Sequence, residues 1–245
     1  MQGKYSESRY SRFVPLPNIG EKGMDMIRKA KVAIVGAGGL GSVTATQLVT
    51  LGVGYVRLFD KDVVETSNLQ RQLLYRQKDV GKQKVVVAKK FLENLNPDVE
   101  IDIIAEKISA DNVHLATEKV DFVVDALDRF TPRLMLNREC LKNNIPYLFG
   151  AVSGMNGNAM TVIHGSTCLE CLFGHVKDEN LPSNLDTGIH PAIIQIIGSL
   201  QVAEATRIMT AQKPLLVNHL LFCDIQTMYF ESINVNNKAN CICQK

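Results

Sequence analysis

A glycine-rich turn is the first group of residues in this sequence whose types and spacing could do chemistry. Gly36, Gly38, Gly39 and Gly41 follow the apolar run Lys31–Val35 and open a segment with helix-forming residues. In a strand–turn–helix setting, the first glycine permits a tight turn, the second lets a phosphate approach the backbone, and the third lets helix and strand pack closely. The N–H groups and positive dipole end of the helix then attract an anion. The pattern predicts a nucleotide-binding turn.

Asp60 ends the next apolar run, where an acid can accept hydrogen bonds from ribose hydroxyls. The same turn and acid occur together in NAD-binding Rossmann domains. On these residues alone, an NAD-dependent oxidoreductase is the favoured interpretation. The turn therefore indicates nucleotide binding without identifying the nucleotide.

A long polar connection after Asp60 changes that interpretation. Its candidate binding residues are Asp62, Ser67, Asn68, Gln70, Arg71 and Lys84. Two cations, Arg71 and Lys84, suit a polyphosphate whose departing pyrophosphate must be stabilised. Asp125 and Asp128 flank the end of another predicted strand, at the sheet edge where such folds bind ligands. A carboxylate there can hold a magnesium ion that bridges phosphate oxygens.

Two close cysteine pairs, Cys168-x-x-Cys171 and Cys241-x-Cys243, suggest a metal site. A C-x-x-C turn presents two sulfurs to a tetrahedral metal, and a closed structural zinc site needs four ligands. We therefore expect the two pairs to hold one zinc ion. A redox role for Cys168 and Cys171 is the alternative, although no thioredoxin-like βαβ context surrounds them.

The elements that must position these residues alternate along the first half of the chain. Apolar, β-branched runs predict strands at Lys31–Val35, Tyr55–Asp60, Val99–Ile104 and Val120–Ala126. Helices are predicted at Gly39–Leu51, Lys84–Asn94 and Asp111–Glu118. Alternation of this kind predicts a parallel sheet with helices on both faces.

The second half has a different character. We expect helices at Thr131–Asn144 and His190–Ala211, and strands joined by short turns at Pro146–Val152, Asn158–His164, His219–Asp224 and Tyr229–Val235. The polar segment Gly174–Thr187 is typical of a mobile loop. The expected fold is α/β: a Rossmann-like, mostly parallel sheet that continues into an antiparallel C-terminal portion, all in one domain over residues 1–245.

Composition excludes several function classes. The 245 residues are 46% hydrophobic and 21% charged, which is ordinary for a globular protein, and the formal net charge is only +2. The sequence has no long Lys/Arg run, so we expect no direct nucleic-acid partner and no membrane surface. No apolar run reaches the roughly 18 residues of a membrane span, and the first residues lack the apolar core of a secretory signal. We expect a cytoplasmic protein with reduced thiols.

Several strings resemble, in order and over nearly the whole chain, the ThiF/MoeB/HesA family of ubiquitin-activating-type adenylyltransferases. These strings are Arg9-Tyr10-Ser11-Arg12, Gly36–Gly41, Ser67–Gln72, Gly81–Lys84, Asp125–Asp128 and Gly198–Gln201. The Ser-Asn-Leu-Gln-Arg-Gln string is highly specific for it. The family often carries C-x-x-C at both cysteine positions, and Cys241-x-Cys243 departs from that by one residue.

The resemblance implies roles for most of these residues. Its cofactors are ATP, magnesium and a structural zinc ion. Asp60 would hold the ribose, Asn68, Arg71 and Lys84 would contact the phosphates, and Asp128 would act through magnesium. Arg12 would reach the γ-phosphate of the ATP in a neighbouring subunit, which makes the active unit a homodimer. Residues 31–130 would then be the nucleotide-binding half, and residues 146–245 the half that binds zinc and the substrate protein.

The implied reaction is adenylation of the C-terminal carboxylate of a ubiquitin-fold, Gly-Gly-tailed sulfur carrier, with release of pyrophosphate. Its products would serve thiamine, molybdopterin or tRNA thiolation pathways. The substrate carboxylate is already ionised, so catalysis needs positioning and charge neutralisation more than a strong base. The region Gly174–Pro191 contains no cysteine, so we expect the enzyme to release the acyl-adenylate to a separate sulfur donor without forming a stable thioester.

Other functions remain open from the sequence. Within the same chemistry, the substrate carboxylate could belong to a peptide or a modified tRNA base. A nucleotide-binding subunit without catalysis is a third class, which the combination of Arg71, Lys84 and Asp128 disfavours. An NAD-dependent oxidoreductase would give those three residues no joint role.

Overall fold

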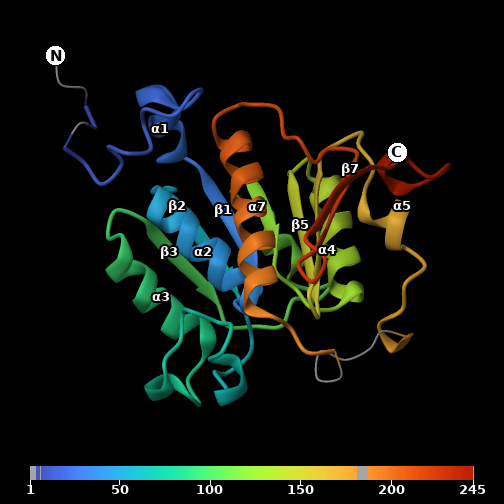
Figure 1. The fold of residues 1–245 in the computed structure, drawn as a ribbon, viewed down its shortest axis with the longest axis horizontal. Helices are drawn as coiled ribbons and strands as arrows, with labels where there is room; N and C mark the ends of the chain where they lie inside the picture. The colour runs from blue at the N-terminus through green and yellow to red at the C-terminus, as the bar shows by residue number, and fades with distance from the viewer. Residues whose placement is uncertain (1–3, 6, 181–186, 245) are drawn as a thin grey trace.

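An eight-stranded sheet with the order β3-β2-β1-β4-β5-β6-β7-β8 organises the chain (Figure 1). The computed structural model describes residues 4–5, 7–180 and 187–244. The parallel half consists of β1 (Lys31–Val35), β2 (Tyr55–Phe59), β3 (Glu100–Ile104), β4 (Phe122–Asp125) and β5 (Tyr147–Ser153). Antiparallel pairing then joins β5 to β6 (Asn156–Val162), β7 (His219–Asp224) and β8 (Tyr229–Asn234). This arrangement confirms the predicted fold class.

Helices cover both faces of the sheet because successive side chains of a buried strand point to opposite sides. Val32 and Ile34 of β1 join one core cluster, with residues of α2 (Gly39–Leu51), α3 (Lys84–Leu95) and α7 (Pro191–Met209). Ala33 and Val35 join a second core cluster, with residues of α4 (Phe130–Lys142) and α5 (Leu169–Phe173). Figure 1 shows α2 and α7 side by side in front of the sheet, with α4 behind it.

The contact between α2 and α7 depends on a glycine from the family-like string Gly198–Gln201. A Cβ atom at Gly198 would lie 2.7 Å from Cγ1 of Val43, closer than real Cβ contacts allow. The absence of a side chain lets the two helices approach, so that α7 covers the start of α2 and the turn before it.

One predicted helix is wrong. In place of a helix at Asp111–Glu118, the structure has only the 3₁₀ turn η3 (Val113–Ala116). The Asn112 side chain accepts a hydrogen bond from the N–H of Ser109, and Lys119 adopts a φ of +58°. Local bonds of this kind favour turns over a continued helix. The short helices α1 (Gly20–Ile27) and α5 were not predicted.

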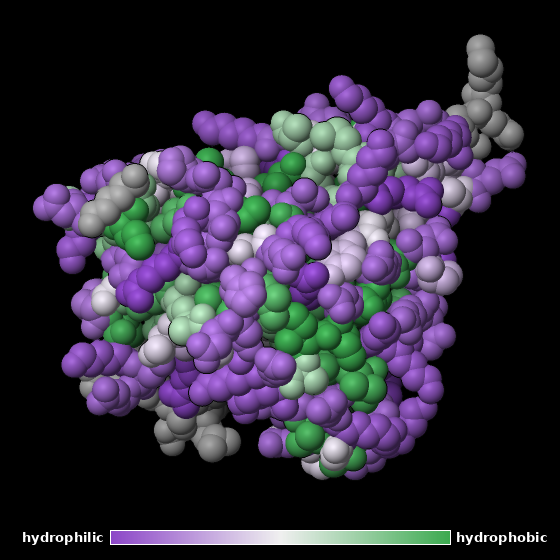
Figure 2. Space-filling view, turned by 180° about the vertical axis from the view of Figure 1, so that it is seen from behind, coloured by the Kyte–Doolittle hydropathy of each residue, from purple (hydrophilic) through white to green (hydrophobic). Residues whose placement is uncertain are grey.

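The remaining elements begin and end within about three residues of the predicted positions. Differences of this size are expected, because element boundaries are the least reliable part of a prediction from sequence. In the predicted loop at 174–187, the 3₁₀ turn η4 spans Asp178–Asn180, while residues 181–186 lie outside the described part of the chain. None of the helices that the structure describes is long and apolar enough to cross a membrane. From behind, the surface is mainly hydrophilic with apolar areas between (Figure 2).

Candidate nucleotide site and cysteine cluster

The glycine turn follows β1 directly and is tightly packed. The N–H of Gly36 donates to the carbonyl of Phe59 on β2 at 2.8 Å, and its φ of +104° favours glycine. A Cβ at Gly36 would meet the backbone of Ala126 after β4, and one at Gly41 would overlap the carbonyl of Gly36. At Gly39, a Cβ would lie 2.8 Å from Cδ1 of Ile194 on α7. The backbone at the start of α2 is therefore held beside the ends of two other strands.

Asp60, at the end of β2, is bonded to this turn. Its Oδ2 accepts from the N–H of Ala37 at 2.7 Å, and its Oδ1 accepts from the N–H of Asp62 at 2.8 Å. Burial raises the pKa of Asp60, while the nearby charge of Lys84 and these two donors act in the opposite direction. The carboxylate that the sequence places near a ribose thus also fixes the position of the turn.

The connection after β2 packs on the other side of the turn. The hydroxyl of Tyr75 donates to the carbonyl of Ala37 at 2.6 Å, and the buried side chain of Gln72 lies against Gly38. No pattern in the sequence pointed to Tyr75. Gln72 belongs to the Ser67–Gln72 string but was given no role. Both residues bring the segment that carries the predicted phosphate ligands to the nucleotide turn.

Of the predicted phosphate ligands, Asn68 and Arg71 lie at or near the 3₁₀ turn η1 (Thr66–Asn68). Asn68 is buried and accepts from the N–H of Glu65, whereas Ser67 and Gln70 are exposed. The guanidinium of Arg71 donates to the carbonyl of Ser67 at 2.8 Å. This bond uses one of the five guanidinium donors, so the others remain available for a phosphate.

Lys84 and Asp62 form an ion pair between the start of α3 and the connection that follows β2. Nζ of Lys84 lies 3.5 Å from Oδ2 of Asp62. Burial raises the pKa of Asp62, but the hydrogen bonds and charges of Lys61 and Lys84 lower it by a larger amount. The pKa of Asp62 is therefore lowered overall. The neighbouring Lys82 is exposed and pairs with Asp79 at 3.0 Å, in agreement with its interpretation as a surface charge.

Asp128 lies just beyond β4. It is therefore at the same edge of the sheet as Asp60, the edge at which the parallel strands end. Its side chain is exposed. The pKa of Lys61 is raised chiefly by a hydrogen bond to Asp62, and the charges of Asp60 and Asp128 both contribute. Asp60 and Asp128 follow the carboxyl ends of β2 and β4, the two strands that flank β1, and so lie on either side of the turn that follows β1. An exposed carboxylate in this position is the type of ligand that magnesium takes in proteins.

Asp125, by contrast, is fully buried. It accepts from the hydroxyl of Tyr147 at 2.5 Å and from the N–H of Leu127 at 2.8 Å, and Nε of Arg133 lies 3.5 Å away. Burial raises the pKa of Asp125. Of the two aspartates that the sequence placed at this strand end, only Asp128 is available to a ligand.

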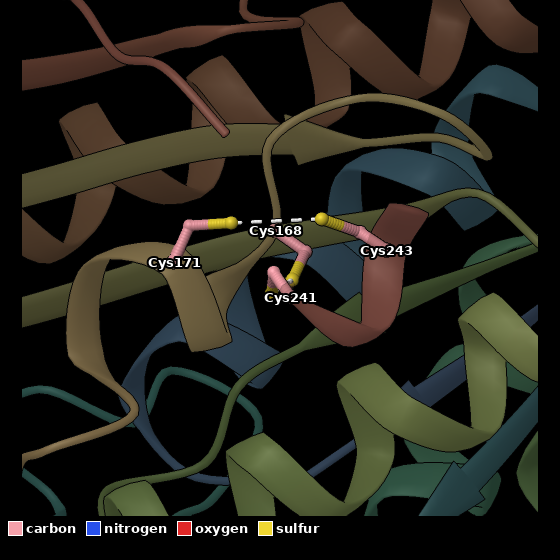
Figure 3. A group of neighbouring side chains, drawn as sticks. All are labelled: Cys168, Cys171, Cys241 and Cys243. Atoms are coloured by element: carbon pink, nitrogen blue, oxygen red, sulfur yellow. Dashed lines mark hydrogen bonds between the residues drawn. The ribbon is translucent and has the colours of Figure 1, made fainter. Parts of the chain in front are cut away.

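The four paired cysteines come together in one cluster (Figure 3), on the face of the sheet that α4 covers. Cys168 and Cys171 lie at the start of α5, and Cys241 and Cys243 lie at the C-terminal 3₁₀ turn η5 (Ile242–Gln244). All four sulfurs lie within 4.8 Å of one another, with pairs at 3.6 and 3.5 Å. Four thiolates at 2.3 Å from a tetrahedral zinc ion are separated by about 3.8 Å, so this donor set fits zinc. The one-residue spacing of the second pair does not prevent the cluster from forming.

Comparison with known proteins places the chain in the ThiF family, whose model matches residues 10–245. The chain is 35% identical over 234 residues to the SAMP-activating enzyme E1 of Haloferax volcanii, with 95% of this chain and 87% of that protein covered. It is 34% identical over 240 residues to the sulfur carrier protein adenylyltransferase of Thermus thermophilus, with 95% and 89% covered. The Bacillus subtilis sulfur carrier protein ThiS adenylyltransferase is 37% identical over 216 residues, with 87% and 62% covered.

A solved structure shows the same architecture. Escherichia coli MccB, solved with MccA-N7isoASN, superposes with a TM-score of 0.85 at 25% identity, over 99% of this chain and 76% of that one. The chain thus belongs to the ThiF family, which confirms the resemblance, the fold and the adenylyltransferase class. The NAD-dependent alternative has no support among these relatives.

Proposed function

We propose that the protein uses ATP to adenylate the C-terminal carboxylate of a ubiquitin-fold sulfur carrier that ends in Gly-Gly. The observation that carries this proposal is the position of three charged residues around the glycine turn. Asp60 bonds to the backbone of that turn, and Lys84 pairs with Asp62, two residues after Asp60. Asp128 follows the Ala126 backbone, which packs against Gly36. Support for the substrate comes from relatives named as sulfur carrier protein adenylyltransferases, which match the chain over most of its length. A carboxylate oxygen of the carrier attacks the α-phosphorus, the bond from this phosphorus to the bridging oxygen breaks, and pyrophosphate leaves.

In this proposal the residues divide the nucleotide between them. The backbone from Gly36 to Gly41 binds phosphate at the start of α2, and Asp60 holds the ribose. Asn68, Arg71 and Lys84 contact the phosphates, with Asp62, Ser67 and Gln70 beside them. The fixed positions of Lys84 and the turn favour catalysis by preorganised charge, since little rearrangement is then needed as pyrophosphate departs.

Asp128 holds magnesium in this proposal. When bound, the ion neutralises phosphate charge and orients the polyphosphate. Asp128 is exposed and lies two residues after Ala126, whose backbone packs against Gly36, so it is accessible to a metal–nucleotide complex at the turn. Zinc in the four-cysteine cluster has a structural role, because it joins α5 to the C-terminal turn η5 within residues 146–245, the half that we assign to carrier binding.

Arg12 acts on a neighbouring subunit in this proposal. Tyr10 packs against Gly52 at the C-terminal end of α2, and its hydroxyl accepts from the side chain of Asn96. The glycine turn lies at the other end of α2, and a 13-residue helix is about 20 Å long. An arginine two residues from Tyr10 is therefore far from the turn of its own chain, which supports a homodimer in which each Arg12 completes the partner's site.

The reaction stops at the acyl-adenylate in this proposal, and a separate sulfur donor acts downstream. The region Gly174–Pro191 has no cysteine that could accept the acyl group. A cytoplasmic location agrees with four closely spaced thiols that need a reducing environment to bind zinc. The carriers of thiamine, molybdopterin and tRNA thiolation pathways are all candidate substrates.

ATP–pyrophosphate exchange tests the proposal. Wild-type protein is incubated with ATP, labelled pyrophosphate, magnesium and each candidate carrier, and with the same carrier lacking its Gly-Gly tail. We expect exchange that depends on the intact tail, and we expect Asp128→Ala and Arg71→Ala to abolish it while circular dichroism stays unchanged. Absence of carrier-dependent exchange with every candidate would overturn the proposal. Exchange with the truncated carrier would indicate a different carboxylate.

A further inference from the structure

A buried cluster of polar side chains lies directly beneath the segment that carries Asp128. It consists of Asp125 at the end of β4, Arg133 on α4 and Tyr147 on β5. Asp125 and Tyr147 are fully buried, and Arg133 is 4% exposed. The Tyr147 hydroxyl donates to Oδ2 of Asp125 at 2.5 Å, and Nε of Arg133 lies 3.5 Å from the same oxygen. None of the three residues is positioned to touch a ligand outside the protein.

Arg133 bonds to the protein backbone through Nη2. Its Nη2 donates to the carbonyls of Leu127 and Gly150, the second at 3.0 Å. Its guanidinium lies over the rings of Phe130 and Phe149, with centroid distances of 5.5 and 5.1 Å. A planar guanidinium held by two rings and two carbonyls has little freedom, because each contact restricts the same plane.

The bonds of this cluster and its neighbours converge on three consecutive residues, Asp125 to Leu127. The carbonyl of Asp125 accepts from Nε2 of Gln201 at 2.8 Å, and its Oδ1 accepts from the N–H of Leu127 at 2.8 Å. The N–H of Ala126 donates to the carbonyl of Val35 at 2.9 Å. Because the Leu127 carbonyl is held by Arg133, the segment is fixed up to the residue immediately before Asp128.

Stability alone gives a poor account of such a cluster. Burying a charged pair costs a desolvation free energy that its attraction often only offsets, and apolar residues of similar volume are frequently as stable. What an arginine supplies here, and an apolar side chain does not, is directional hydrogen bonding to a particular loop carbonyl.

We propose that Arg133 and Tyr147, acting through Asp125 and Leu127, are positioning residues that hold Asp128 in place for the magnesium–ATP complex. The inference rests on the proposed role of Asp128. Neither residue contacts the nucleotide. Their loss loosens the segment behind Asp128, so the metal requirement changes while the apparent affinity for metal-free nucleotide does not.

Arg133→Lys and Tyr147→Phe test the inference. The first keeps the charge but loses the fork that reaches two carbonyls, and the second removes one oxygen. Partners that orient metal ligands typically account for about 10- to 100-fold in metal affinity or activity. We expect roughly a tenfold rise in the magnesium concentration for half-maximal ATP–pyrophosphate exchange in Arg133→Lys, and a smaller rise in Tyr147→Phe. We also expect weaker Mn²⁺ binding with an ATP analogue, measured by electron paramagnetic resonance.

Arg57→Lys is the matched control. Arg57 on β2 also pairs with an aspartate, Asp102 at 3.0 Å, and donates to the carbonyls of Leu115 and Glu118. Asp102 lies on the edge strand β3, and Leu115 and Glu118 lie in or just after η3, before β4 begins, whereas Asp128 follows the end of β4. We expect the Arg57→Lys variant to be less stable than the wild type, with an unchanged magnesium concentration for half-maximal exchange.

Two outcomes separate this inference from the proposed function. If the wild type shows no carrier-dependent exchange, the proposed function fails, and Mn²⁺ binding still decides the inference. Wild-type Mn²⁺ affinity in a folded Arg133→Lys variant would overturn it. If that variant does not fold, unchanged Mn²⁺ affinity in Tyr147→Phe overturns it, and weakened affinity supports it.

Discussion

Nζ of Lys84 lies 3.5 Å from Oδ2 of Asp62, and the two side chains differ sharply in exposure, at 8% and 48%. Their backbones are also joined, since the N–H of Lys84 donates to the carbonyl of Asp62 at 2.9 Å. An ammonium group has three donors, and this single carboxylate does not occupy them all. The pair thus places a largely desolvated cation close to Asp60 and the glycine turn, where its charge acts with little screening by water.

The first prediction concerns that cation. Lys84→Met keeps the length of the side chain and removes the charge, so we expect ATP–pyrophosphate exchange to fall by about 100-fold or more, as for other groups that stabilise transition-state charge. The fold should persist, because a buried charge is replaced by an apolar chain. Lys82→Met is the control, since Lys82 is exposed and pairs with Asp79. Equal losses in the two variants would contradict a specific role for Lys84.

The second prediction concerns the four cysteines. Protein purified without chelator should contain about one zinc ion per chain, because four sulfurs within 4.8 Å of one another form a closed tetrahedral donor set. Removal of the metal should lower the thermal midpoint by about 5 °C or more, since binding to such sites contributes to folding free energy. Metal analysis and differential scanning calorimetry measure the two effects.

Cysteine variants give the matched comparison for zinc. Cys243→Ser should lower the zinc content, whereas Cys223→Ser, at a buried cysteine outside the cluster, should keep it. Chelator-free protein without zinc would refute the metal site. Equal zinc loss in both variants would show that the content reports general destabilisation instead of ligation.

Part of this site was predictable from sequence because its signals are local. The glycine turn, Asp60 and the cysteine pairs each depend on short spacings next to a recognisable strand or helix. The ends of parallel strands lie on one edge of a sheet, so the placement of Asp60 and Asp128 on the same edge also followed from the strand pattern.

Other features depend on contacts that no short spacing reveals. Tyr75 reaches the carbonyl of Ala37 across 38 positions, and Arg133 on α4 reaches the carbonyl of Gly150 on β5 across 17 positions. The sequence grouped Asp125 with Asp128, yet only burial by Tyr147 and Arg133 separates their roles. The wrong helix at residues 111–118 has the same origin, because Asn112 formed local bonds that compete with a helix.

The third prediction concerns pH. Asp178 accepts from the N–H groups of Phe130 and Thr131, the first two residues of α4, at 2.6 and 3.2 Å. Burial raises its pKa, but the hydrogen bonds from Thr131 and Phe130 lower it by more, so the pKa in the folded protein lies below the ordinary value of 3.8. A lowered carboxyl pKa stabilises the fold above pH 3.8, and this contribution is lost as the pH falls through the folded-state pKa.

Asp178→Ala should therefore lower the thermal midpoint at pH 7 by about 2–4 °C, which corresponds to a lost helix cap of about 1 kcal/mol. The difference from the wild type should shrink as the pH is lowered below 3.8, where the wild-type carboxyl becomes protonated. Asp111→Ala, at an exposed aspartate, should cause no change at any pH. Thermal melts across this range measure the effect, and a constant difference down to the lowest pH would contradict the role of the charge.

The last prediction concerns the arrangement of subunits. Arg12 and Asp128 belong to the same site only if they come from different chains, since the Tyr10 segment lies at the far end of α2 from the glycine turn. Arg12→Ala and Asp128→Ala should each abolish exchange. When the two variants are coexpressed, half of the dimers are mixed, and one of the two sites in each mixed dimer is intact. Coexpression should therefore restore about a quarter of the wild-type sites. Coexpression of Asp128→Ala with Lys84→Met should restore none, as both residues serve the site of their own chain. Recovery in the second pair, or none in the first, would refute the exchange of Arg12 between subunits.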